Sequence, residues 1–454
     1  METKHYDVFV IGSGIAGQTV AKTCAKNNLK VAVAEKIKFG GTCALRGCDP
    51  KKVMMQFSEI TKKTKQLQGL GFTDLPKIDW QQVLDFKDKF IKKVPTATKE
   101  NLEELGIDLY SESPRFTDEN TIKIGDEKIT ATHFVIASGL TPRELAISGK
   151  EYLKTSKDIF SLPSIPKSMI FIGSGYVGME FASMFATLGS KVTVIETGEK
   201  ILSQFDEYLT DKIQESLEKE GVKFIFNAET TSIERNNNQL LLKYKVDGKE
   251  HELTSEEIFN TSGRVPSVQD LDLEIANIKN DNKKGVLVTD YLQSETNKKV
   301  FACGDVSSKS LPLTPLSGLQ GHIVAQNILK GNQKKFENPL VPSIVFSHPN
   351  ISRVGLSEKE AKKNCKNLKV YKGDASNWYN AKKENTDAYA FKIFVDDDSQ
   401  LILGAELLGT EANESINIIT MAMEKNITIK ELKKMIFTYP SYAIDLRKMF
   451  KKED

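Results

Sequence analysis

The chain has 454 residues, a formal net charge of +2 and 39% hydrophobic residues, which is enough for about three domains with buried cores. Because basic and acidic residues almost cancel, charge gives no indication of a nucleic-acid or membrane-surface partner. The five cysteines are mostly scattered, and no apolar stretch approaches the ~18–20 residues that a membrane span needs. We expect no secretory leader, because glycine and serine come directly after the first apolar run. We therefore expect a cytoplasmic protein in a reducing compartment.

The N-terminal segment has the pattern of a βαβ unit. Residues 7–11 form an apolar run, which Gly12, Gly14 and Gly17 follow before a helical pattern and a second strand. Glycines at these places permit a tight turn, the close approach of a pyrophosphate and the packing of helix on strand. Glu35 ends the second strand, where a carboxylate binds ribose hydroxyls. The unit predicts a dinucleotide site.

A cysteine pair comes after this unit, in the stretch GGTCALRGCDPKK of residues 40–52. Cys43 and Cys48 are too far apart for a thioredoxin-type CxxC motif, and a zinc site would need further ligands nearby, which do not follow. A reversible disulfide explains the pair better. Lys51, Lys52 and the start of a helix would favour the thiolate form.

The βαβ pattern returns in the middle of the chain. The strand of residues 169–172 leads into Gly173, Gly175 and Gly178, and the next strand ends at Glu196. The first glycine and the terminal glutamate are separated by 23 residues in both units. Two copies of one nucleotide-binding spacing predict two bound dinucleotides, which suits electron transfer between cofactors.

Glu196 also indicates which nicotinamide is used. A carboxylate at this position accepts hydrogen bonds from the ribose diol and repels a 2′-phosphate. The next residues are Thr197, Gly198, Glu199 and Lys200, without the arginine that NADPH sites place here. The sequence favours NADH over NADPH.

Further motifs occur in a characteristic order along the whole chain. They are ASG at 137–139, GRVP at 263–266, FACGD at 301–305, LTPL at 313–316 and VPSIVF at 341–346. Together with the two glycine loops and the cysteine pair, they make the chain similar to the FAD-dependent pyridine nucleotide-disulfide oxidoreductases of the glutathione reductase and dihydrolipoamide dehydrogenase type.

The resemblance implies an α/β fold with two Rossmann-like dinucleotide-binding domains, for FAD and NAD(P), and a C-terminal α+β interface domain. It places the first FAD segment at residues 1–148, with a helical excursion from about 51 to 105. The nicotinamide domain would cover residues 149–268, the second FAD segment 269–336 and the interface domain 337–454. Members of this family are twofold homodimers with shared active sites, so we expect a homodimer.

The resemblance also implies residues for each cofactor. FAD would contact Gly12, Gly14, Gly17, Glu35, Gly41, Thr42, Lys52, Ser138, Gly139, Arg264, Gly304 and Asp305, with Asp305 on the ribitol. The nicotinamide dinucleotide would contact Gly173, Gly175, Tyr176, Gly178, Glu196 and Gly263, with Tyr176 covering the nicotinamide pocket.

In the mechanism that the resemblance implies, electrons pass from the nicotinamide through FAD to the Cys43–Cys48 disulfide. Cys48 would be the sulfur nearer the flavin, and Cys43 would attack the acceptor. Lys51 and Glu180 match an ion pair near the flavin, although Lys52 is a neighbouring possibility.

The C-terminal region departs from the family pattern. Disulfide reductases of this family carry a His-Pro pair that acts as acid and base for the thiols, but this chain has Tyr439-Pro440. A phenol, which ionises only near pH 10, is a poor base at neutral pH. Thiol chemistry should therefore be slower, or the acceptor should need less proton help. Arg46, between the cysteines, either meets an anionic acceptor or lies on the surface.

These observations favour a reductase of a small disulfide or a related thiol-reactive acceptor. Mercuric ion reductase, glutathione-disulfide reductase and dihydrolipoamide dehydrogenase remain alternatives. A flavin-bound redox sensor with little turnover is an alternative of a different class. We expect no bound metal and no nucleic-acid or membrane partner.

Overall fold

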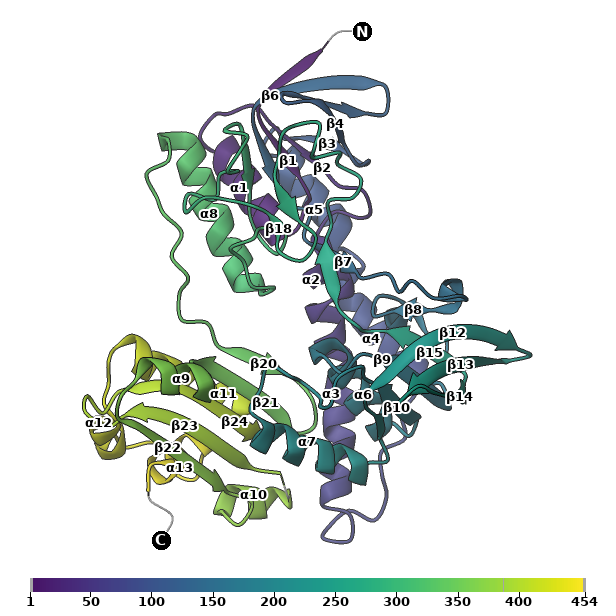
Figure 1. Cartoon of the computed structure of the whole chain (residues 1–454), viewed down its shortest axis with the longest axis vertical. Coiled ribbons are helices and arrows are strands. Elements are labelled where there is room, and N and C mark those ends of the chain that lie inside the picture. Colours follow the sequence, from purple (N-terminus) through teal and green to yellow (C-terminus); the bar gives the residue numbers. More distant parts are fainter. Residues whose placement is uncertain (1–2, 387, 452–454) are drawn as a thin grey trace. The chain divides into compact units, whose positions relative to one another are not determined.

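The computed structural model describes residues 3–386 and 388–451, which fold into two compact units (Figure 1). The first unit comprises residues 3–54, 84–143 and 263–338. The second unit comprises residues 55–83, 144–262 and the described residues from 339 onward. Within these ranges, no helix combines the length and the apolar character needed to cross a membrane.

A seven-stranded sheet forms the centre of the first unit. Its strand order is β3-β2-β1-β6-β5-β4, and β19 pairs with β6. Strand β1 is parallel to both β2 and β6, whereas β4, β5 and β6 are joined by antiparallel pairing. The bounds are β1 Lys4–Ile11, β2 Val31–Ala34, β3 Asp108–Tyr110, β4 Arg115–Asp118, β5 Thr121–Ile124, β6 Glu127–Ile136 and β19 Val300–Ala302.

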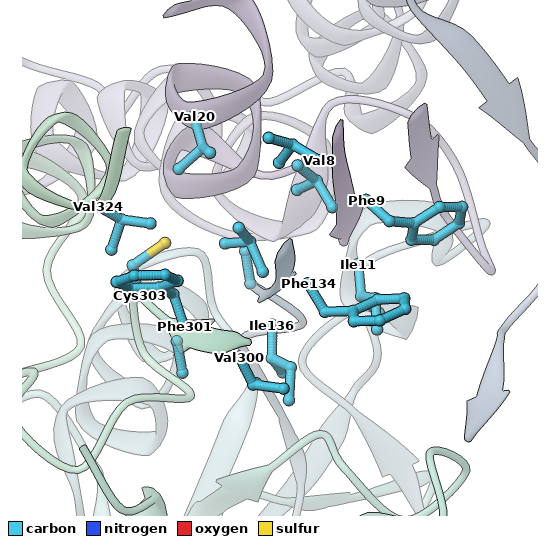
Figure 2. Close-up of a cluster of buried hydrophobic side chains, with 14 of the residues drawn as sticks. Val8, Phe9, Ile11, Val20, Phe134, Ile136, Val300, Phe301, Cys303 and Val324 are labelled. Atoms are coloured by element: carbon cyan, nitrogen blue, oxygen red, sulfur yellow. The ribbon is translucent and has the colours of Figure 1, made fainter. Parts of the chain in front are cut away.

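Strands β2 and β19 and the C-terminal ends of β1 and β6 are buried on both faces, which explains their unbroken apolar runs. Figure 2 shows Val8, Phe9 and Ile11 of β1 beside Phe134 and Ile136 of β6, and all five side chains are buried. Helix α1 lies beside helix α8 (Figure 1). The two helices can approach closely because Gly321 of α8 has no side chain. A Cβ added there would lie only 2.7 Å from the carbonyl oxygen of Ala16.

Helices and short strands complete the first unit, and α3 and α4 contribute residues to both units. The helices are α1 Ile15–Ala25, α2 Gly41–Arg46, α3 Cys48–Gln66, α4 Trp80–Ile91, α5 Val94–Glu103 and α8 Thr314–Lys330. The short strands are β7 Leu140–Pro142, β16 Arg264–Pro266, β17 Asn280–Asp281 and β18 Gly285–Val286.

The second unit contains a five-stranded parallel sheet and a three-stranded antiparallel sheet. The parallel sheet has the order β11-β10-β9-β15-β8, and the antiparallel sheet has the order β12-β13-β14. The strands are β8 Lys154–Thr155, β9 Ser168–Ile172, β10 Lys191–Ile195, β11 Lys223–Ile225, β12 Ala228–Asn236, β13 Gln239–Val246, β14 Lys249–Ser255 and β15 Glu257–Asn260. The helical elements are η1 Lys150–Tyr152, η2 Asp158–Ser161, α6 Tyr176–Thr187 and α7 Glu207–Lys219.

A five-stranded antiparallel sheet, ordered β20-β21-β24-β23-β22, carries the C-terminal part of the second unit. Its strands are β20 Ser343–Val345, β21 Asn350–Gly355, β22 Leu368–Asp374, β23 Ala390–Asp396 and β24 Ile402–Gly409. Its helices are α9 Glu358–Asn364, α10 Tyr379–Glu384, α11 Ala412–Glu424, α12 Ile429–Lys434 and α13 Tyr442–Met449.

An ion pair joins this antiparallel sheet to the parallel-sheet part of the unit. The ammonium group of Lys392 on β23 lies 2.7 Å from the carboxylate of Asp206, which caps the N-terminus of α7. The two sheets with parallel strands and the antiparallel C-terminal sheet confirm the predicted α/β class with two Rossmann-like regions and an α+β region.

Candidate active site

The first glycine loop has the geometry that a dinucleotide requires. Gly12 has a φ of +109°, and a Cβ added there would lie 2.4 Å from the carbonyl oxygen of Ala137. A Cβ at Gly17 would lie 2.0 Å from the carbonyl oxygen of Gly12, so any larger residue at this position would prevent α1 from packing against the turn. Gly14, in contrast, faces open space on its Cβ side, next to the N-terminus of α1. The loop therefore leaves room for a pyrophosphate beside the unpaired N–H groups of the helix.

Glu35 is held in place by the loop that it faces. The backbone N–H and the hydroxyl of Ser13 both donate to Glu35 Oε2, at 3.1 and 2.7 Å. The N–H of Ile37 donates to Oε1 at 3.0 Å. The role of Ser13 was not predicted, although the repeat of Gly-Ser-Gly in both loops was a signal for it. Glu35 also lines a cavity of about 260 Å³, together with Ile37, Lys38, Phe39, Pro95, Lys99 and Ser111.

Several predicted cofactor residues from distant parts of the chain meet in the first unit. The guanidinium of Arg264 donates to the carbonyl oxygen of Leu140 at 2.6 Å. Ser138 Oγ is buried and has no hydrogen-bond partner among the described residues. The hydroxyl of Ser317 donates to Asp305 at 3.1 Å, and burial raises the pKa of Asp305. A buried hydroxyl without a partner and a partly buried carboxylate fit a polar ligand such as FAD.

The two cysteines lie at the starts of consecutive helices. Cys43 is in the short helix α2, and Cys48 is the first residue of α3. Gly47 separates the helices, and a Cβ there would lie 2.9 Å from the carbonyl oxygen of Thr42. At the other end of α2, a Cβ on Gly41 would lie 2.5 Å from the Cα of Gly14. The cysteine pair is therefore built directly on the first glycine loop.

The two thiols have opposite electrostatic character. The pKa of Cys48 is lowered to about 6, first because Cys43 donates a hydrogen bond to its sulfur, while partial desolvation opposes the shift. The positive charges of Lys51 and Lys52 and the hydroxyl of Thr314 lower it further. The pKa of Cys43 is raised, first by the same hydrogen bond to Cys48 and then by burial. The predicted thiolate character is therefore favoured at Cys48 and disfavoured at Cys43.

Two contacts of Cys43 were not predicted. The hydroxyl of Thr314, the first residue of α8, donates to Cys43 Sγ at 3.1 Å. The carboxylate oxygen Oδ1 of Asp49 lies 3.9 Å from the same sulfur. Thr314 is 271 residues away in sequence, so only the fold could reveal its contact. Asp49 follows Cys48 directly, but its direction depends on the bend at Gly47.

Arg46 has electrostatic neighbours on the nucleotide side of the unit. Its side chain is partly buried, and burial lowers its pKa. Glu35 favours the charged form, and the nearby cation Arg264 disfavours it. Since Glu35 and Arg264 are both predicted FAD residues, Arg46 lies beside the cofactor loop. Whether Arg46 meets an anionic acceptor or lies on the surface stays a prediction.

The second glycine loop, in the second unit, repeats the first. Gly173 has a φ of +102°, and a Cβ at Gly178 would lie 2.3 Å from the carbonyl oxygen of Gly173. The N–H and hydroxyl of Ser174 donate to Glu196 Oε2 at 2.8 and 2.6 Å. Thr197 Oγ1 and the N–H of Gly198 donate to Oε1 at 3.1 and 3.0 Å.

The remaining predicted residues are distributed between the units. Lys51 is buried in the first unit. Glu180, on α6 of the second unit, is buried and accepts a hydrogen bond from the N–H of Phe346 at 2.9 Å. Tyr439 is exposed, and its ring centroid lies 6.2 Å from that of Tyr379. The Lys51–Glu180 pair and the role of Tyr439 stay predictions.

The sequence matches two family patterns that together span most of the chain. Residues 6–321 match "Pyridine nucleotide-disulphide oxidoreductase", and residues 341–449 match the dimerisation domain of the same name. The chain is 32% identical to a glutathione reductase of Nostoc sp. (97% of this chain, 98% of the relative). It is 31% identical to a mercuric reductase of Staphylococcus aureus (97% and 81%).

Solved structures of one bacterial flavoprotein are similar over the whole length. The HOCl-induced flavoprotein disulfide reductase RclA from Escherichia coli matches with a TM-score of 0.86 and 28% identity, covering 98% of this chain and 99% of that chain. A Cu(II) complex of the same protein matches with a TM-score of 0.86 and 28% identity, covering 97% and 98%.

Proposed function

Because this chain belongs to the pyridine nucleotide-disulphide oxidoreductase family and is an FAD-dependent NAD(P)H oxidoreductase, we propose that Cys43 and Cys48 are its redox-active pair. The pair passes electrons to a small disulfide or a related thiol-reactive acceptor. The observation that carries this proposal is the placement of the two thiols on consecutive helices built on the first glycine loop, where Cys43 contacts Thr314 and Cys48 has Lys51 and Lys52 as electrostatic neighbours. The lysines favour the thiolate form of Cys48, whereas the hydrogen bond to Cys48 and burial favour the thiol form of Cys43.

The first unit supplies the residues that would hold FAD. The residues 12–17 and the N-terminus of α1 cradle the pyrophosphate, Glu35 binds the ribose, and Asp305 binds the ribitol. When bound, FAD supplies the two-electron carrier between the nicotinamide and the cysteines. Arg46 adds a positive charge on the nucleotide side, where the pyrophosphate is negative.

The cysteines perform the exchange with the acceptor. The sulfur of Cys43 attacks one sulfur of the acceptor disulfide, whose S–S bond breaks, and the proton of Cys43 leaves with the released thiol. The Cys48 thiolate then attacks Cys43 Sγ, which closes the Cys43–Cys48 disulfide and expels the second half as a thiolate. Two electrons pass from the cysteine pair to the acceptor. The hydroxyl of Thr314, which donates to Cys43 Sγ, stabilises the negative charge that this sulfur carries as it gives up its proton during the attack.

The second unit supplies the nicotinamide site, and we propose NADH as the donor. Glu196 carries four protein donors, which hold its pKa below the ordinary value although burial opposes the shift. It is therefore ionised at neutral pH, and a charged carboxylate accepts a ribose hydroxyl but repels a 2′-phosphate. Tyr176, at the start of α6, would cover the nicotinamide pocket, and Glu180 would pair with Lys51.

The C-terminal segment would complete the site in a second copy of the chain. Residues 341–449 match a dimerisation domain, and we propose a homodimer with shared active sites. The exposed Tyr439 would stand at the partner's cysteines, in the place of the family's histidine. We also propose a reducing, cytoplasmic setting for the protein. The predicted domain limits at residues 148, 268 and 336 stay predictions.

Metal-ion reduction is a second candidate. It is favoured by the presence of Tyr439 where the family has a histidine. A metal ion that is bound by the two thiolates can be reduced and released without a proton donor. The relatives include a mercuric reductase and a flavoprotein with a Cu(II) complex.

The test is an anaerobic titration of the FAD-loaded protein with NADH and NADPH, followed by a panel of acceptors. The panel contains glutathione disulfide, lipoamide, coenzyme A disulfide, mercuric ion and cupric ion. Cys43→Ser should reduce acceptor turnover by about 10³-fold or more while NADH still reduces the flavin. Cys365→Ser, at a thiol outside this site, is the matched control. Full acceptor turnover by Cys43→Ser would disprove the role of the pair.

A further inference from the structure

The residue directly after the second cysteine is an exposed aspartate that faces the first cysteine. Asp49 lies in the first turn of α3, and its Oδ1 is 3.9 Å from Cys43 Sγ. Cys43 itself is only partly exposed, so an acceptor that reaches this sulfur also approaches Asp49. The carboxylate is therefore a charged part of the surface that the acceptor meets.

The positive charges near the cysteine pair have electrostatic neighbours other than Cys43. Lys51 and Lys52 favour the thiolate of Cys48. Arg46 has Glu35 and Arg264 as its electrostatic neighbours, on the cofactor side. The charge that acts on Cys43 is that of Asp49, which contributes to the raised pKa of Cys43 after the effects of Cys48 and burial. Asp49 therefore places an anion in contact with the sulfur that attacks the acceptor.

We propose that Asp49 determines acceptor specificity by charge, so that Cys43 reacts faster with cationic and neutral disulfides than with anionic ones. This inference rests on the proposed function of the cysteine pair. An anionic group beside the acceptor's S–S bond would come within a few ångströms of the Asp49 carboxylate as Cys43 attacks, and the two would repel each other. A cationic group would be attracted. Glutathione disulfide, with carboxylates on each half, belongs to the disfavoured class.

Three disulfides of similar size and different charge test the proposal. They are cystamine, with an ammonium group on each half, the neutral bis(2-hydroxyethyl) disulfide, and 3,3′-dithiodipropionate, with a carboxylate on each half. Wild type and Asp49→Asn are compared as FAD-loaded protein with saturating NADH. For Asp49→Asn we expect kcat/KM to fall about 3- to 10-fold for cystamine and to rise about 3- to 10-fold for dithiodipropionate. The value for the neutral disulfide should change less than about 2-fold.

The controls separate charge from structure. Asp49→Glu should keep the wild-type order of acceptors. Glu103→Gln removes the same charge from an exposed position on α5 of the same unit and should leave all three values unchanged. Raising the salt concentration should reduce the discrimination in the wild type, because exposed charges are screened.

The possible outcomes are distinct. If Asp49→Asn slows all three disulfides by one factor, Asp49 is a proton carrier or a structural residue, and charge selection is wrong. An unchanged ratio between cystamine and dithiodipropionate would also overturn it while leaving the redox role of the cysteines intact. If the wild type reduces none of the disulfides, the proposed function fails instead, and this inference fails with it.

Discussion

The two glycine loops have almost the same backbone and hold their glutamates in the same way. Gly14 and Gly175 both have a φ near −70° and an extended ψ, and each N-terminal glycine donates to the end of the neighbouring strand at 2.8 Å. In both loops a buried serine gives two hydrogen bonds to one carboxylate oxygen of the glutamate. The G-S-G sequence therefore determines the local structure without regard to which dinucleotide it binds.

The loops differ in the segment that comes after the second strand. Three donors from the described residues occupy Glu35, which leaves one lone-pair position for a ribose hydroxyl. Glu196 has four donors among the described residues, one of them the side-chain hydroxyl of Thr197. Ser13 Oγ also accepts the N–H of Gly40 at 3.1 Å, which connects the first loop to the cysteine helix. The chemistry of each site therefore comes from the segment after the second strand and not from the glycine loop.

The largest effect is expected from breaking the loops themselves. Gly17→Ala places a Cβ 2.0 Å from the carbonyl oxygen of Gly12, so the purified protein should lose nearly all bound flavin. Gly178→Ala, with a Cβ 2.3 Å from Gly173 O, should keep its flavin and lose reduction by NADH. The flavin-to-protein absorbance ratio and anaerobic NADH titration measure the two effects.

Gly318→Ala on α8 is the control for these variants, since its Cβ would meet Ile15 at an ordinary 3.4 Å. Flavin loss in Gly178→Ala, with retention in Gly17→Ala, would reverse the assignment of the two sites.

Replacing either glutamate should weaken the binding of one cofactor and leave the binding of the other unchanged. Glu196→Ala should raise the KM for NADH about 10- to 100-fold, because a hydrogen bond to a charged group is lost, and should narrow the gap to NADPH. Glu35→Ala should weaken flavin retention and leave the KM for NADH unchanged in the flavin-loaded fraction. Steady-state kinetics with both nucleotides tests this. Equal use of NADH and NADPH by the wild type would contradict the role given to Glu196.

The cysteine segment distinguishes the first loop from the second, and it makes the stability of the reduced protein and the reactivity of Cys48 depend on pH. The Cys48 pKa of about 6 in the folded reduced protein lies below the ordinary thiol value of about 8.5. Between these values the unfolded chain binds more protons, so stability rises with pH in this window and the contribution is lost as pH falls through about 6. Alkylation of Cys48 by iodoacetamide, mapped by mass spectrometry, should have its midpoint near pH 6.

Lys51→Met should move that midpoint upward by about 0.5 to 1 pH unit, because a positive charge near the thiolate is removed. Lys63→Met, on the part of α3 in the second unit, is the matched control. A midpoint that does not move would show that the lysine has no effect on the thiolate.

The smallest expected effect concerns the fourth donor on Glu196. Thr197→Val removes a hydroxyl that competes with the ribose for Oε1, so the KM for NADH should fall about 2- to 5-fold. Thr197→Ser, which keeps the hydroxyl, is the control. An increase in KM would mean that the hydroxyl helps to hold the carboxylate in position.

The sequence was sufficient for features that depend on local spacing. Both βαβ units, the fold class and the cysteine pair could be predicted from residues close together in the chain. The contacts of Cys43 could not be predicted in the same way, since its partner Thr314 lies 271 residues later in the sequence. The electrostatic neighbours of Arg46, which are Glu35 and Arg264, could not be predicted either, because neither lies close to it in sequence.

The packing of α1 against α8 has a consequence for synthesis on the ribosome. The first unit begins at β1, but its sheet gains β19 only at residues 300–302, and α8 comes later still, at residues 314–330. The segment of residues 144–262, which forms the parallel sheet of the second unit, is translated in between. Nicotinamide-site strands can therefore pair on the nascent chain while α1 still lacks its covering helix. A ribosome stalled before α8 would carry the complete sequence of the second glycine loop, while the first loop would still lack the helix that covers α1, so we expect flavin capture to follow the synthesis of α8.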